Sequence, residues 1–144
     1  MSETNTVKLL KECDSGVKMA LASIEDLGEK AKASDLKQIL AKSKEEHKKI
    51  EGEICCALRE NGAQEKEPGM MARGMSWAKS NMKMAMDASD ATVAGLVTDG
   101  CDMGVKSLTQ YMNEYEDADK KSKDLCKELI SLEEKLEKDM RAYL

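Results

Sequence analysis

The chain has 144 residues, which is enough for one domain with its own apolar core. It is 35% charged and 41% hydrophobic, with one proline and no phenylalanine, a balance typical of all-helical proteins. A net charge of −5 with both signs interspersed argues against nucleic acid, and the apolar runs are too short to cross a membrane. Residues 1–8 lack the pattern of a signal peptide, so we expect a cytoplasmic protein.

The first part of the chain carries two apolar seams whose steps alternate between three and four residues, the pattern of bundle helices. The first seam predicts a helix over residues 6–27 that ends near Gly28. The second predicts a helix over residues 34–60, with Ser34 as its N-cap and Asn61-Gly62 as its C-terminal stop. The predicted seam of that helix is Leu36, Leu40, Ser43, His47, Ile50, Ile54 and Ala57. Together they predict a helical hairpin over residues 6–60.

Residues 61–89 are expected to cross back along the bundle and to contain a short helix over residues 70–86. That helix holds six of the eleven methionines and the only tryptophan, and methionine is common at adaptable binding surfaces. The candidate interaction residues are Met70, Met71, Met75, Trp77, Met82 and Met86. They could mediate a homodimer or bind a protein partner; the alternatives are packing between the hairpins and metal or redox chemistry.

The last part of the chain predicts a second hairpin over residues 90–144. Its first helix is expected over residues 90–116. The predicted seam of that helix is Ala94, Thr98, Cys101, Val105, Leu108, Met112 and Tyr115. An acidic turn leads to a second helix over residues 119–142, whose seam is mostly leucine.

A hexapeptide repeat links the two hairpins. The run from Cys13 to Lys18 returns 88 residues later, from Cys101 to Lys106, with five of six positions matching. This predicts an internal duplication in which the hairpins are related by a pseudo-two-fold axis. Chance repetition in a helical chain of low diversity is the alternative. Two hairpins with one long crossover have the connectivity of ferritin-like four-helix bundles.

The Gly16-Val17 pair and the run from Gly69 to Lys79 resemble a family of small bacterial ferritin-like proteins of unknown function. The resemblance implies a ferritin-like fold over nearly the whole chain, as one domain, and implies no particular activity. No stretch of the sequence forms a catalytic motif, so we expect a non-catalytic interaction or stress-related accessory protein without a cofactor.

The ligands of a di-iron site are not all present in the sequence. Such sites take a Glu from each of two helices and Glu-x-x-His from each of the other two. This chain has one histidine, His47, and the residue three positions before it is Lys44. The position expected to correspond to His47 in the second hairpin is Leu136. Two Glu-x-x-His motifs are therefore impossible.

An atypical metal-binding or redox site near His47 is the alternative function. The residues that could contribute are His47, Asp14, Asp102, Glu46 and Glu133. The opposing interpretation gives His47 a hydrogen bond to a backbone or hydroxyl group such as Ser43, and gives the two aspartates ion pairs with the lysines four positions on. The five cysteines have no CxxC spacing and are interpreted as small residues in a reducing compartment, mostly buried.

Overall fold

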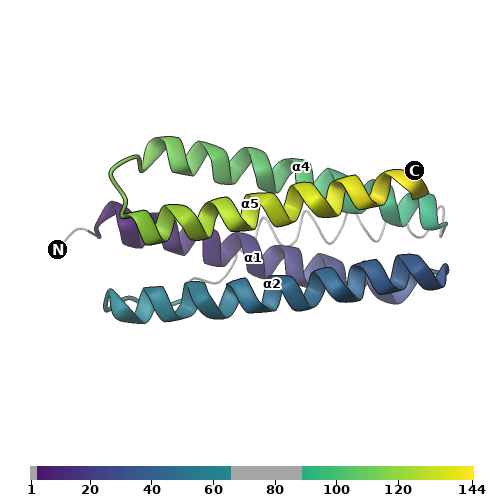
Figure 1. The fold of residues 1–144 in the computed structure, drawn as a ribbon, viewed down its shortest axis with the longest axis horizontal. Coiled ribbons are helices and arrows are strands. Elements are labelled where there is room, and N and C mark those ends of the chain that lie inside the picture. The colour runs from purple at the N-terminus through teal and green to yellow at the C-terminus, as the bar shows by residue number, and fades with distance from the viewer. Residues whose placement is uncertain (1–2, 66–88) are drawn as a thin grey trace.

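A computed structural model of the protein describes residues 3–65 and 89–144. These residues form the helices α1 (Asn5–Lys30), α2 (Ser34–Glu60), α4 (Asp90–Glu114) and α5 (Lys120–Met140), with a 3-10 turn η1 (Arg141–Tyr143). The helices lie along one common axis (Figure 1), and none of them is long and apolar enough to span a membrane. The predicted all-helical class is confirmed. The expected helix over residues 70–86, with its candidate interaction residues, lies outside the described residues.

The helix ends are set by short polar side chains, as expected from capping chemistry. Thr4, Ser89 and Asp119 are N-caps whose side chains accept from the backbone N–H three residues on. The predicted C-terminal stop of α2 is confirmed, because Gly62 has φ +69° and the N–H of the next residue returns to the Leu58 carbonyl.

Ser34 is expected from the sequence to be an N-cap, and that prediction is wrong. Ser34 is the first residue of α2, and the cap position is Ala33, whose side chain accepts no hydrogen bond. The N–H groups of Lys32 and Ala33 instead donate to the Asp90 carboxylate, at 2.7 and 3.0 Å. A carboxylate from the other hairpin therefore takes part of the capping role.

Each hairpin turn docks on the start of the other hairpin's first helix. The turn before α2 binds Asp90, the first residue of α4. The turn before α5 donates from the Asp119 N–H to the Thr6 hydroxyl of α1, at 2.8 Å. Helices α1 and α4 therefore run in opposite directions, and α4 begins at the end of the bundle where α1 ends (Figure 1). α2 ends and α4 begins at opposite ends of the bundle.

The two copies of the hexapeptide have different surroundings. Cys13 follows the first residue of α1 by eight positions, whereas Cys101 follows that of α4 by eleven. Asp14 is completely buried, and Asp102 is exposed. A two-fold axis that exchanges the hairpins would relate the two turn contacts to each other. The same axis would not superpose the hexapeptides, because the second copy lies about one helical turn further along its helix than the first. The duplication stays a prediction.

The interior contains two apolar clusters at different levels of the bundle. The first gathers the beginning of α1, the end of α2 and the first half of α5, with Leu108 from α4. The second gathers the end of α1, the beginning of α2, the first half of α4 and the end of α5. On α2 the buried residues between the two clusters are Ser43 and His47, and on α5 the residue between them is Glu133. A polar layer therefore divides the core.

Two helix glycines with open surroundings provide a stability prediction. A Cβ atom on Gly52 or Gly100 would meet no atom within 4 Å. We expect Gly52→Ala and Gly100→Ala each to raise the free energy of unfolding by about 0.5–1 kcal/mol, because alanine restricts the unfolded chain and favours helix. Gly62→Ala is the matched control and should lower it by about 1 kcal/mol, since its φ is +69°. Urea unfolding measures all three; equal effects at the three positions would contradict the prediction.

Candidate functional site

Three buried polar residues meet at the middle of the bundle. His47 is 0% exposed, Ser43 5% and Glu133 6%. His47 Nε2 lies 3.0 Å from Glu133 Oε1, which joins α2 of the first hairpin to α5 of the second. On the other side of the ring, Nδ1 lies 2.8 Å from the Ser43 carbonyl oxygen and 3.3 Å from its hydroxyl.

Both ring nitrogens of His47 are therefore engaged by protein groups. One proton between Nε2 and Oε1 satisfies both atoms. Nδ1 faces a carbonyl to which it can donate and a hydroxyl from which it can accept, so either tautomer finds partners. In the described part of the chain, no buried side-chain nitrogen or oxygen lacks a hydrogen-bond partner. The expected bond to Ser43 is confirmed, and the contact with Glu133 adds to it.

Helix α4 completes the surroundings of Glu133 with two residues. Cys101 is buried, and burial, followed by the nearby Glu133 carboxylate, raises the pKa of its thiol. A thiol with a raised pKa is a poor nucleophile and a poor metal ligand. A Cβ atom on Gly104 would lie 3.7 Å from Glu133 Cδ, so this glycine is the residue of α4 against which the carboxyl packs.

The two aspartates of the repeat lie elsewhere. Asp14 accepts from Lys18 Nζ at 2.6 Å and lies 3.9 Å from Cys55 Sγ. Burial, followed by the Glu65 and Asp14 carboxylates, raises the pKa of Cys55 to about 12. Asp102 is exposed, and its carboxylate raises the pKa of the neighbouring Glu137 carboxyl. The expected ion pair of the first aspartate with the lysine four positions on is therefore confirmed.

Of the five candidate metal residues, the structure brings only His47 and Glu133 into contact. Glu46 lies near the surface, with its carboxylate 3.5 Å from Lys135 Nζ. Within residues 3–65 and 89–144, no group of three or more His, Cys, Asp or Glu side chains is arranged to hold a metal ion. The metal hypothesis thus rests on the His47–Glu133 pair alone.

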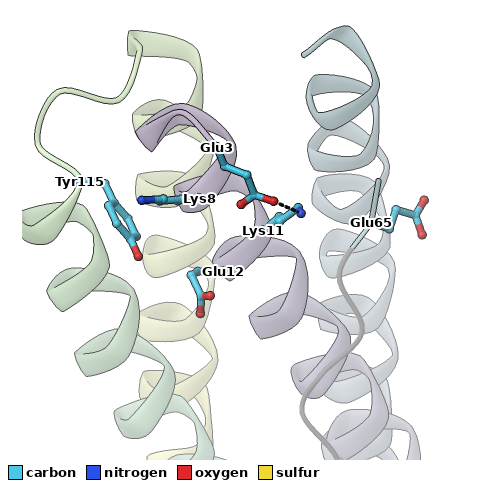
Figure 2. A pocket seen from close by; sticks show the side chains of 6 residues that line it. All are labelled: Glu3, Lys8, Lys11, Glu12, Glu65 and Tyr115. Atoms are coloured by element: carbon cyan, nitrogen blue, oxygen red, sulfur yellow. Dashed lines mark hydrogen bonds and ion pairs between the residues drawn. The ribbon is translucent and has the colours of Figure 1, made fainter. Parts of the chain in front are cut away.

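A surface pocket of about 370 Å³ lies at the start of α1, beside the end of α4 (Figure 2). The side chains that line it are Glu3, Lys8, Lys11, Glu12, Glu65 and Tyr115. Lys11 is already ion-paired with Glu3, and Glu65 lies 3.5 Å from Lys18. The pocket is open and of mixed charge, and its groups do not converge on one point in Figure 2. The buried polar layer is therefore the better-defined site.

Cys101 and Gly104 were not predicted from the sequence to be neighbours of Glu133. The sequence did contain one indication, because Gly104 lies in a predicted helix three positions after the seam residue Cys101. A glycine inside a helix indicates that a side chain from a neighbouring helix packs closely there. It could not show which helix supplies that neighbour. No family model, curated protein or solved structure matches the chain.

We predict that His47 and Glu133 are strongly coupled in stability. His47→Leu should lower the free energy of unfolding by about 3 kcal/mol, because Glu133 loses its partner in the core. Glu133→Met should cost a similar amount by leaving His47 Nε2 without a partner in the core. The double variant should lie within about 1 kcal/mol of the parent, because two apolar side chains of similar volume replace the pair. Urea unfolding of all four proteins gives the coupling energy; additive single effects would contradict the prediction.

Proposed function

We propose that the chain is a ferritin-like four-helix bundle, related to the bacterial family it resembles, that acts without catalysis. Its role would be that of a cytoplasmic interaction or stress-related accessory protein. The observation that carries this proposal is the His47 ring, both of whose nitrogens are hydrogen-bonded to protein groups. Where a di-iron bundle would present ligands to metal, this bundle uses its one histidine to join two of its own helices.

The crossover connection supports the ferritin-like part of the proposal. The described residues end near the C-terminus of α2 and resume at the opposite end of the bundle, where Asp90 binds the first turn. One long crossover between two hairpins is the connectivity of ferritin-like folds. The resemblance of the run from Gly69 to Lys79 falls in this same segment.

Under this proposal, the protein acts by binding partners through its surface. In the proposed homodimer, the methionines of residues 70–86 and Trp77 supply the apolar contact, because adaptable side chains suit a protein interface. A two-fold dimer is the commonest way to cover such a surface. A different protein partner is the second occupant compatible with the same residues.

A metal-loading experiment tests the non-catalytic proposal. We expect protein incubated anaerobically with Fe(II) and then desalted to retain no stoichiometric iron, because His47 and Glu133 are committed to each other. Elemental analysis measures retention. Two irons per chain would overturn the proposal. One metal per chain that is lost in His47→Ala but kept in Asp102→Asn would support the alternative, an atypical metal or redox site near His47.

Light scattering tests the association. We expect the parent chain to have the mass of a dimer, and a variant with Met75, Met82 and Met86 changed to glutamine to have that of a monomer. Met103→Gln is the matched control, because Met103 is a methionine of α4 that is 63% exposed. A monomeric parent would contradict the homodimer. A dimer that survives the triple change and dissociates with Met103→Gln would place the interface on α4.

A further inference from the structure

The ammonium group of Lys18 binds carboxylates from three parts of the first hairpin. They belong to Asp14 on the same helix, Glu51 on α2 and Glu65 in the segment that follows α2, at 2.6, 4.0 and 3.5 Å from Lys18 Nζ. Asp14 is 0% exposed, so its charge depends on a partner that reaches into the bundle. One lysine therefore joins a buried carboxylate of α1 to the segment after α2.

Residues 61–65, which we call the strap, fold back on the end of α2. Gly62 has φ +69°, and its N–H donates to a carbonyl oxygen of the last turn at 3.0 Å. The Ala63 N–H donates to the Leu58 carbonyl oxygen at 2.8 Å, and the Ala63 side chain packs against the first apolar cluster. Few contacts hold the strap apart from the ion pairs of Glu65, so those pairs decide whether it stays closed.

The ion pairs of Lys18 form an inner arm and an outer arm. The inner arm joins Lys18 to the buried Asp14, and breaking it would leave a charge without a partner in the interior. The outer arm joins Lys18 to Glu65, whose side chain is 42% exposed and also lies 3.9 Å from the exposed Arg59. Exposed ion pairs contribute little to stability. The outer arm can therefore open while the inner arm and the bundle stay intact.

The thiol of Cys55 lies beside this network. Its Sγ is 3.9 Å from Asp14 Oδ1, the same oxygen that binds Lys18. Cys55 is half-buried, whereas the next residue, Cys56, is exposed. The high pKa of Cys55 agrees with this position, because burial and the Glu65 and Asp14 carboxylates all disfavour the thiolate. A thiol that stays protonated is a poor nucleophile.

We propose that residues 61–65 are a strap that Lys18 holds closed, and that local opening of this strap controls the reactivity of the Cys55 thiol. When Glu65 leaves Lys18, a negative charge moves away from the thiol and the end of α2 becomes more exposed. Both changes favour the thiolate and admit a reagent. The strap is thus a conformational switch for one thiol, and it works without unfolding of the four helices.

Alkylation of the full chain with N-ethylmaleimide under native conditions tests the proposal, with fragment-ion masses separating the adducts of Cys55 and Cys56. Glu65→Gln should raise the alkylation rate of Cys55 about fivefold, the effect of losing one exposed ion pair on the open population. The rate of Cys56 should stay unchanged. Glu60→Gln is the matched control, because this exposed carboxylate of α2 binds Lys121 at 2.9 Å, and it should leave the rate of Cys55 unchanged.

Hydrogen exchange separates opening of the strap from simple loss of a charge. The Ala63 N–H should exchange about fivefold faster in Glu65→Gln, since its bond to Leu58 exists only in the closed strap. Faster alkylation of Cys55 with unchanged exchange at Ala63 would overturn the proposal, because the charge alone would then explain the rate. An unchanged rate of Cys55, or an equal rise at Cys56, would overturn it as well.

Discussion

The interior depends on the contact between His47 and Glu133. Both side chains are buried, and they meet at 3.0 Å in a layer with apolar clusters on either side. A buried carboxyl without a partner costs several kcal/mol, so packings of α2 on α5 that separate the pair are disfavoured by roughly that amount. A slip of one helical turn moves a residue by about 5.4 Å, enough to break the contact. The pair therefore fixes the register between helices of different hairpins, a role well attested for buried polar groups.

Register is also held at both ends of the bundle. Asp90 accepts two N–H groups from the turn of the first hairpin, and Thr6 accepts one from the turn of the second. Side-chain to backbone bonds of this kind are directional, whereas the leucines of the two clusters tolerate sliding. The hairpins are thus held at three levels by polar contacts, and the apolar clusters supply the area buried between them.

The sequence predicted the helices well and the contacts between them poorly. Every seam residue expected on the helix 34–60 is buried, including Ser43 and His47, because one face of that helix meets the core along its whole length. On α4 the expected seam is only partly right: Thr98 and Val105 are half-buried, whereas Val93 and Val97 are buried. Periodicity identifies an apolar face but not the neighbour that covers it. The meeting of His47 with Glu133 depends on that neighbour, so the sequence could suggest the glutamate among other carboxylates but could not single it out.

The hexapeptide repeat shows how far identical residues can differ in chemistry. If a two-fold axis exchanged the hairpins, α4 would take the place of α1, and α2 would take the place of α5. A contact of Cys13 with α5 would then correspond to a contact of Cys101 with α2. Cys101 instead contacts Glu133, which is also on α5. The pKa of both thiols is raised, but mainly through Cys126 for Cys13 and through burial for Cys101. The first cysteine therefore packs in the apolar cluster that also holds Cys126, whereas the second packs near a carboxylate that helps to raise the pKa of its thiol.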